Sequence, residues 1–225
     1  ETTERALFNI AMNNEASRLC HVSETVNEVY EEIREIYLNH GKTRGVPTGF
    51  YEIDDITGGL QPANLIIIAG RPSMGKTSLA MNIAAHAAMV EKKSVAFFSL
   101  EMSRNDLLMR LIGTAAGVDG NKIRKGDLSQ ADWESIYDAT ELLNNSKLYI
   151  DDTGQIGVAE IRSKCRRIKD LALVVVDYIS LMATNTKESR QQEVSELSRQ
   201  LKGLARTLNV PVIVLSQLNR GVTSG

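Results

Sequence analysis

The sequence predicts an α/β fold in which a parallel β-sheet is flanked by helices on both faces. Short apolar runs typical of buried strands alternate with longer segments of helical periodicity, and these runs lie at 65–69, 94–100, 147–150, 173–176 and 212–215. Strands that are joined through helices pair in parallel and need cover on both faces. A glycine-rich motif between the first of these strands and the helix that follows also favours this class.

Composition places the chain among ordinary globular proteins. It has 225 residues, of which 43% are hydrophobic and 24% charged, enough for one α/β domain with a short appendage. These values exclude a disordered, collagen-like or rod-like coiled-coil protein. Two cysteines and three histidines without a C-x-x-C pair predict neither a disulfide framework nor a zinc site. With no long apolar run and no apolar leader, we expect a cytoplasmic protein that does not bind a membrane.

The charge of the chain is nearly balanced. Lys and Arg number 26 and Asp and Glu 28, which gives a formal net charge of −2 at pH 7. A protein of this charge does not bind nucleic acid through its overall charge. Any contact with nucleic acid is therefore expected at a local patch, or at a site assembled from several subunits.

The expected helices lie between the strands, at 77–90, 107–113, 130–143 and 158–169, and along an apolar stripe from Val194 to Leu208. Ser129 is expected to cap the third of these helices, with Trp133 turned inward. The run at 65–69 is almost entirely apolar, which favours a strand buried on both faces. Asp151 and Asp152 end a strand, and we expect them to open a glycine-containing turn.

The first 43 residues differ from the rest. A narrow apolar stripe predicts an amphipathic helix between residues 23 and 40, and its members are Val26, Val29, Ile33 and Ile36. Such a helix is not stable alone, so it must dock either on its own domain or on a neighbouring subunit. Residues 40–49 contain three glycines and a proline, which predicts a linker. We therefore expect a linker region at 1–43 and a nucleotide-binding domain at 44–225.

One motif predicts a nucleotide-phosphate site. Residues 70–77 match G-x-x-x-x-G-K-[ST] in full, between a buried strand and a helix, as this motif requires. The glycines let backbone N–H groups curl around phosphate oxygens, and the helix adds its positive end. Lys76 would contact the β- and γ-phosphates of ATP, and Thr77 would bind Mg²⁺. The residues expected to contact the nucleotide are Gly70, Arg71, Pro72, Ser73, Met74, Gly75, Lys76, Thr77 and Ser78.

Three polar side chains follow other strands of the expected sheet. Asp177 comes directly after four apolar residues and is the expected second magnesium ligand, with a turn as its alternative role. Glu101 follows the strand at 94–100 and would activate water, or else mark a helix start. Gln217 follows the last strand, where an amide would sense the γ-phosphate. Because the carboxyl ends of parallel strands share one edge, all three should lie beside the phosphate loop.

Several longer segments occur in an order that is found in one family. They are GVPTGFYEIDDITGGLQPANLIIIAGRPSMGKTSLA, FFSLEMS, YIDDT, EIRSKCRRIK, VVVDYISLM, RQQEVSELSRQLKGLA and VPVIVLSQLNR. From about Arg44 to Val222 the chain thus resembles the hexameric DnaB-type replicative helicases of bacteria and phages. The resemblance implies a RecA-like motor domain, preceded here by a linker helix that docks on the adjacent motor domain.

The resemblance also implies an activity and partners. It implies an ATP- and Mg²⁺-dependent enzyme that moves 5′→3′ on single-stranded DNA and unwinds forked duplex in the bacterial cytoplasm, where a phage protein would also act. A homohexameric ring, a primase and a helicase loader are the implied partners. Matched position by position, Lys76, Thr77 and Asp177 hold the nucleotide and metal, Glu101 is the catalytic glutamate, and Gln217 is the γ-phosphate sensor.

Two loops of the family line the channel of the ring and bind single-stranded DNA. The first corresponds to residues 183–191 and contains Lys187 and Arg190, whose alternative role is that of solvated surface charges. The second corresponds to residues 221–225. Both loops are expected to act together across the subunits of a ring.

The chain also departs from the family. The primase-engaging domain and the segment that carries an arginine finger fall outside Glu1–Gly225, and the junction from Asp170 to Leu173 is short. Two other functions stay open at this point. One is a RecA- or KaiC-like ATPase that binds DNA without unwinding it. The other is a nucleotide-switched module that loads or anchors other proteins.

Overall fold

The computed structural model describes residues 19–38, 45–177 and 190–217 of the chain. The chain divides into two units, Glu1–Lys42 and Thr43–Gly225. In the first unit a 3-10 turn, Val22–Glu24, precedes α2, Val26–Leu38. The helix expected between residues 23 and 40 is therefore present. None of its residues is buried, and its apolar stripe is 48–59% exposed.

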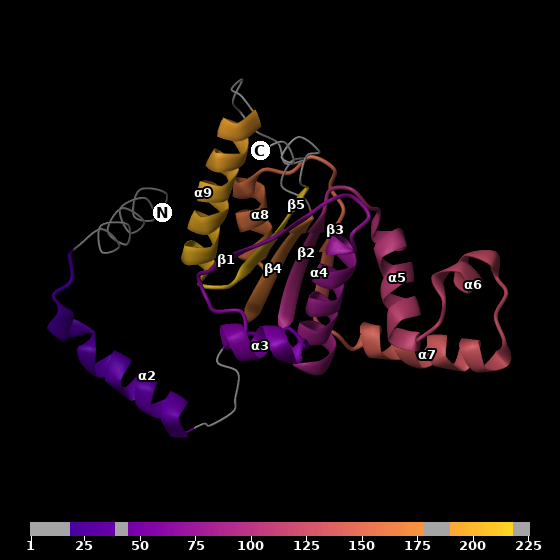
Figure 1. Cartoon of the computed structure of the whole chain (residues 1–225), viewed down its shortest axis with the longest axis horizontal. Coiled ribbons are helices and arrows are strands. Elements are labelled where there is room, and N and C mark those ends of the chain that lie inside the picture. Colours follow the sequence, from indigo (N-terminus) through magenta and orange to yellow (C-terminus); the bar gives the residue numbers. More distant parts are fainter. Residues whose placement is uncertain (1–18, 39–44, 178–189, 218–225) are drawn as a thin grey trace, which may run out of the picture. The chain divides into compact units, whose positions relative to one another are not determined.

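The second unit is built on a five-stranded sheet in which every pair of neighbouring strands is parallel (Figure 1). The strand order is β1-β5-β4-β2-β3. The strands are β1, Leu65–Gly70; β2, Ser94–Ser99; β3, Leu148–Asp151; β4, Leu171–Asp177; and β5, Val212–Gln217. The predicted fold class is confirmed, because helices lie on both faces of a parallel sheet.

The helices follow the predicted alternation with strands. They are α4, Lys76–Ala85; α5, Arg104–Ala116; α7, Gln130–Asn144; α8, Val158–Cys165; and α9, Arg190–Leu208. A π-helical turn, His86–Val90, extends α4. Helix α8 ends four residues before the expected position. Two helices were not predicted, α3, Tyr51–Thr57, and α6, Gly120–Lys125, since segments of one or two turns show no clear periodicity.

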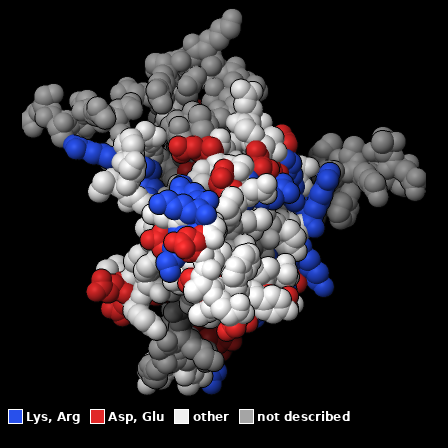
Figure 2. All heavy atoms as spheres, turned by 90° about the vertical axis from the view of Figure 1, so that its right-hand side faces the viewer, with Lys and Arg blue, Asp and Glu red and all other residues white. Residues whose placement is uncertain are grey.

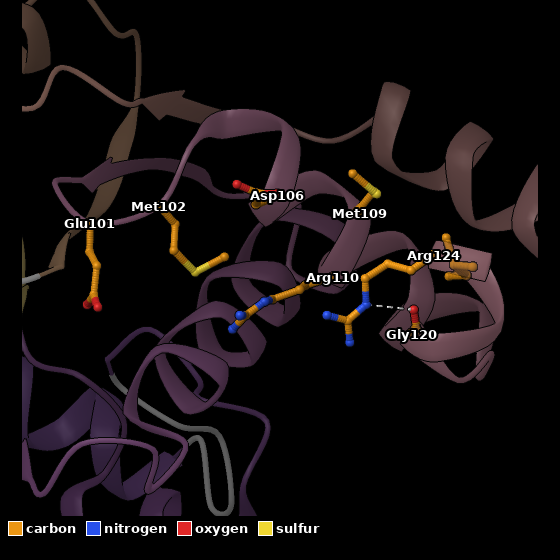
Figure 3. A pocket seen from close by; sticks show the side chains of 8 residues that line it. Glu101, Met102, Asp106, Met109, Arg110, Gly120 and Arg124 are labelled. Carbon is orange, nitrogen blue, oxygen red and sulfur yellow. Dashed lines mark hydrogen bonds between the residues drawn. The ribbon is translucent and has the colours of Figure 1, made fainter. Parts of the chain in front are cut away.

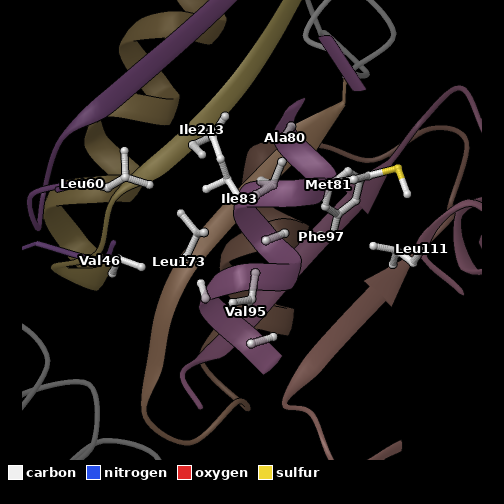
Figure 4. Packing of buried hydrophobic residues seen from close by; sticks show 14 of the residues in the cluster. Val46, Leu60, Ala80, Met81, Ile83, Val95, Phe97, Leu111, Leu173 and Ile213 are labelled. Atoms are coloured by element: carbon white, nitrogen blue, oxygen red, sulfur yellow. The ribbon is translucent and has the colours of Figure 1, made fainter. Parts of the chain in front are cut away.

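Two apolar layers cover the two faces of the sheet. Alternate side chains of the central strands point to opposite faces, as the pleat requires. One layer joins β4 to α8 and α9 through residues such as Val174, Ile161 and Leu201. The other joins the sheet to α4 and α5, with Ile83, Phe97, Leu173 and Ile213 among its members (Figure 4). The site described below lies at the carboxyl edge of this packed sheet.

Two expectations about burial are wrong. Strand β1 lies at one end of the described sheet, and its Ile67 is 54% exposed although Leu65, Ile66 and Ile68 pack against the two apolar layers. Trp133 is 57% exposed although Ser129 caps α7 as predicted. The reason is that α7 packs against α5 rather than against the sheet, so that only one narrow side of α7 is covered. Within the described residues no helix is long and apolar enough to cross a bilayer.

Asp151 closes β3 and fastens it to α8. Its carboxylate lies 2.7 Å from Nζ of Lys164, and it also accepts the backbone N–H of Thr153 in the expected turn. Partial burial of Asp151 would raise the pKa of its carboxyl, but the hydrogen bonds from Lys164 and Thr153 outweigh burial and lower that pKa below its usual range. The ionised form of Asp151 is therefore favoured by folding.

We expect Asp151→Asn to lower the free energy of unfolding at pH 7 by about 1 kcal/mol. A lowered folded-state pKa contributes stability above the unfolded pKa of about 3.9, and this contribution is lost as the pH falls through the folded value. Urea denaturation from pH 7 to pH 3 should therefore show the variant and the parent chain converging below about pH 4. The exposed Asp138 on α7 provides a matched Asp→Asn control, and an equal loss of stability in that control would contradict the assignment.

Candidate functional site

The glycine-rich loop joins β1 to the first turn of α4. Gly75 precedes α4 with φ of 81°, and Ser73 also has a left-handed φ of 62°. Two left-handed residues so close together turn consecutive backbone N–H groups toward one centre, which forms an anion-binding nest. The amino end of α4 adds its partial positive charge at the same place. The loop therefore has the geometry of a phosphate cradle.

Two side chains of this loop have fixed partners. The Lys76 ammonium donates a hydrogen bond to the Arg71 carbonyl at 3.0 Å, so its charge lies over the loop. The Thr77 hydroxyl donates to the Asp177 carboxylate at 2.7 Å. Because Asp177 is the last residue of β4, this contact joins the phosphate loop to a strand 100 positions further along the chain.

Asp177 is 2% exposed. Burial raises the pKa of its carboxyl, the Thr77 hydrogen bond lowers it, and the charge of Glu101 raises it again. Lys76 and Arg110 supply the positive charge that acts on this carboxyl. Asp177 is thus a desolvated acid close to a second acid, and a cation would compensate both of them.

The donor set at Thr77 and Asp177 fits Mg²⁺. A hydroxyl oxygen and a carboxylate oxygen, 2.7 Å apart beside the phosphate loop, are the hard ligands that this ion prefers. Among the described residues no group of three or more His, Cys, Asp or Glu could hold a metal ion. A metal at this place would therefore take its remaining ligands from water and phosphate, as Mg²⁺ does in nucleotide sites.

Glu101 lies in the turn between β2 and α5, and it is exposed. Together with Met102, Arg110 and Arg124 it lines a cavity of about 320 Å³. Figure 3 shows that the Arg110 guanidinium extends from α5 toward the side of the cavity on which Glu101 lies. The N–H of Leu100, the residue before Glu101, donates to the Asp177 carbonyl, so the two acids stand on adjacent backbone segments.

Gln217 is the last residue of β5, and it is exposed. Its Cα pairs with that of Gly70, the first residue of the phosphate loop. At the same edge of the sheet, Ser99 at the end of β2 pairs with Asp177 at the end of β4. The strand ends that carry the loop, the amide and the two acids are therefore neighbours on one edge, as the sequence predicts.

The sequence reasoning missed Arg110. Its positive charge acts on Asp177 and its side chain lines the cavity beside Glu101. The residue stands in the middle of α5 and belongs to no recognised motif, so only the orientation of that helix shows its relation to the site. The other basic residue that lines this cavity, Arg124, donates a hydrogen bond to the Gly120 carbonyl of its own helix.

The residues expected to bind DNA are not placed by the structure. Lys187 and residues 221–225 lie outside the described part of the chain, and of Arg190 only its position as the first residue of α9 is known. Among the expected nucleotide contacts, those from Arg71 to Met74 are exposed in the loop, and Ser78 is exposed on α4. Their roles stay predictions.

The comparison with known families shows the family of this chain. The family model described as the DnaB-like helicase C terminal domain matches residues 45–225. This chain belongs to that family. The matched DnaB-like region contains the whole second-unit sheet, and with it the phosphate loop, both acids and Gln217.

Named relatives of the DnaB-like family agree with this assignment. The replicative DNA helicase DnaC of Bacillus subtilis is 43% identical over 97% of this chain, and the replicative DNA helicase DnaB of Geobacillus stearothermophilus is 41% identical over 99% of it. This chain covers 49% and 50% of those two proteins, respectively. It thus spans about half the length of the curated relatives that it matches.

Solved structures of DnaB-like proteins have the same fold. One of them, described as an ATPase domain, superposes with a TM-score of 0.84 at 36% identity, covering 90% of this chain and 73% of that one. A DnaB-like replicative helicase, studied with its interactions with primase, superposes with a TM-score of 0.80 at 36% identity, covering 93% of this chain and 52% of that one. The second unit is a RecA-like ATPase domain of the DnaB type.

Proposed function

We propose that the intact protein is an ATP-dependent replicative DNA helicase. The observation that carries this proposal is the hydrogen bond between Thr77 of the phosphate loop and the buried Asp177, in a chain of the DnaB-like family. Relatives named as replicative DNA helicases, matched over nearly the whole chain, support it further. In this proposal ATP hydrolysis drives movement along single-stranded DNA and separation of the duplex at replication forks.

ATP is the proposed substrate, and the phosphate loop is its proposed cradle. The backbone N–H groups around Ser73 and Gly75 would bind phosphate oxygens, and the Lys76 ammonium would exchange its Arg71 carbonyl partner for the β- and γ-phosphates. Thr77 and Asp177 would hold Mg²⁺, which supplies neutralisation of the charge that develops on the phosphates. Nucleotide binding would thus replace the Arg71 partner of Lys76, while Thr77 and Asp177 already lie side by side.

Hydrolysis needs a base and a sensor beside the γ-phosphate. Glu101 follows the carboxyl end of β2 and is exposed, and the residue before it donates its N–H to the Asp177 carbonyl. It would orient and deprotonate the attacking water. Gln217 would detect the γ-phosphate through its amide, since it ends the strand that pairs with the start of the loop.

Assembly is the second part of the proposal. We propose that six copies form a ring and that α2 docks on the motor domain of an adjacent copy, because its apolar stripe is 48–59% exposed. Single-stranded DNA would bind to the channel through segments that include Lys187 and Arg190. One solved relative is described with primase, and we propose that this protein also meets a primase and a loader, in the bacterial cytoplasm.

The surface charge is compatible with binding DNA in a channel. Figure 2 shows blue and red side chains interspersed on the described part of the face that carries α5, α6 and α7, without a broad area of one sign. A weak contribution from each of six copies, converging on one strand, gives strong binding because the contacts are linked. Binding of this kind does not require a basic protein.

A strand-displacement assay with the intact protein tests the proposal. We expect ATP hydrolysis that single-stranded DNA stimulates, together with unwinding of a forked duplex. Lys76→Ala should abolish both, while Lys93→Ala, just before β2 at the opposite edge of the sheet, should leave both unchanged. Stimulated hydrolysis without unwinding would favour the RecA- or KaiC-like ATPase. Nucleotide-dependent assembly with negligible turnover would favour the loading or anchoring module.

A further inference from the structure

A side chain at the end of β2 closes the turn that carries Glu101. We define the Glu101 turn as residues 99–102. The buried Ser99 hydroxyl donates a hydrogen bond to the Met102 carbonyl at 2.7 Å and accepts one from the Met102 N–H at 3.2 Å. Ser99 is 1% exposed, so these bonds are protected from water. One side chain therefore fixes both ends of the backbone segment on which Glu101 stands.

The Glu101 turn is also tied to the strand of the second acid. The N–H of Leu100, the residue before Glu101, donates to the Asp177 carbonyl at 2.6 Å. Ser99 and Asp177 are paired in the sheet at the same level. The backbone distance between the two acids is thus set by a direct hydrogen bond, and it does not depend on the flexible part of either side chain.

A third interaction comes from the residue that follows β3, and it holds the segment between the turn and α5. The Asp152 carboxylate accepts the backbone N–H of Arg104, the first residue of α5, at 3.0 Å and the Arg104 guanidinium at 3.2 Å. The Arg104 N–H, and the Arg104 charge with it, lower the pKa of this carboxyl. Asp152 stands 48 positions away from Arg104 in the sequence. It anchors the point at which the Glu101 turn enters the helix.

We propose that Ser99 and Asp152 are positioning residues for Glu101, holding the proposed base at a fixed place relative to Asp177 and the phosphate loop. The inference rests on the proposed function and deepens it by naming what preorganises its base. Small displacements of a reacting group cost large factors in rate. Nucleotide affinity depends on the phosphate loop, whereas the hydrogen bonds described for Ser99 and Asp152 go to Met102 and Arg104. The effect of removing them should therefore appear in kcat and not in KM.

The test measures DNA-stimulated ATP hydrolysis by the intact protein and its variants. We expect Ser99→Ala to lower kcat by about 10- to 100-fold and Asp152→Ala by about 10-fold, with KM for ATP changed by less than about two-fold. Asp152→Asn keeps an oxygen acceptor for the Arg104 N–H and should restore most of the rate. Ser129→Ala removes the serine that caps α7, far along the chain from this turn, and serves as the control for a general loss of stability.

A second arm separates positioning from general weakening. If Ser99 and Asp152 act through Glu101, each alanine variant should change the residual rate of the Glu101→Gln protein by less than about two-fold. An equal fall in both backgrounds, or a rise in KM that accounts for the loss, would overturn the inference. Wild-type kcat in both alanine variants would also overturn it. If Ser99→Ala does not fold, the variants Asp152→Ala and Asp152→Asn decide the result, because Asp152 is exposed.

The outcomes keep this inference distinct from the function on which it depends. Loss of turnover in Glu101→Gln, with normal kcat in Ser99→Ala and Asp152→Ala, rejects the positioning role alone. Undiminished turnover in Glu101→Gln rejects the assignment of the base, and the positioning role with it. A decrease of kcat in Ser99→Ala and Asp152→Ala that disappears in the Glu101→Gln background supports both the assignment of the base and the positioning role.

Discussion

Glu101→Gln is expected to lower the rate of ATP hydrolysis by about 10²- to 10⁴-fold. The amide keeps the size of the side chain but cannot accept the proton of the attacking water. ATP binding and assembly should persist, because Lys76 and Thr77 are unchanged. Steady-state hydrolysis and equilibrium nucleotide binding, both measured on the intact protein, separate these two effects.

A matched control for this variant lies on α7. Glu141 is exposed on that helix, and Glu141→Gln makes the same chemical change away from the carboxyl edge. It should hydrolyse ATP at the parent rate. Turnover in Glu101→Gln that equals that of this control would show that another group deprotonates the water.

Asp177→Asn is expected to separate stability from activity. Asp177 is 2% exposed, and burial raises the pKa of its carboxyl, so the charged form is disfavoured by folding. Asparagine removes the buried charge and still accepts the Thr77 hydroxyl. We expect the free energy of unfolding without nucleotide to rise by roughly 1 kcal/mol at neutral pH. Mg²⁺-dependent hydrolysis should fall by about 100-fold or more, because a metal ligand is lost.

Urea denaturation of this chain and ATP hydrolysis by the intact protein measure the two halves of this expectation. Asp54→Asn is not a suitable control, because Asp54 accepts the backbone N–H groups of Thr48 and Gly49. The exposed Asp138 on α7 is a suitable one, and Asp138→Asn should change neither quantity. A loss of stability in Asp177→Asn would mean that the charge has stabilising partners beyond Thr77, Lys76 and Arg110.

The local pattern of apolar and polar residues was sufficient to predict the strands and the strand ends that carry the candidate site. Asp177 directly follows an apolar run and Gln217 comes two positions after one, and in a parallel sheet such a run carries the residues that follow it to the common edge. The phosphate loop was predictable because its motif is specific and its flanking elements agree with it. None of these inferences needed the order of the strands.

The features that local pattern did not show depend on which element packs on which. Ile67 is exposed on β1, which lies at one end of the described sheet, and strand order is not a property of a six-residue run. Trp133 is exposed because α7 lies on α5. The relation of Arg110 to Asp177, and that of Asp152 to Arg104, join residues far apart in the chain. Such pairs appear only when the helices are oriented in space.

The strand order has a consequence for biosynthesis. Strand β5 is the last strand of the described chain, yet it lies between β1 and β4 and pairs with both. Until Val212–Gln217 has left the ribosome, β1 has no partner among the described strands, and β1 and β4 each keep unpaired backbone groups. A nascent chain is therefore exposed to edge-to-edge aggregation until this segment has been made. The phosphate loop follows β1, and β1 is joined to the rest of the described sheet only when β5 has been inserted between β1 and β4.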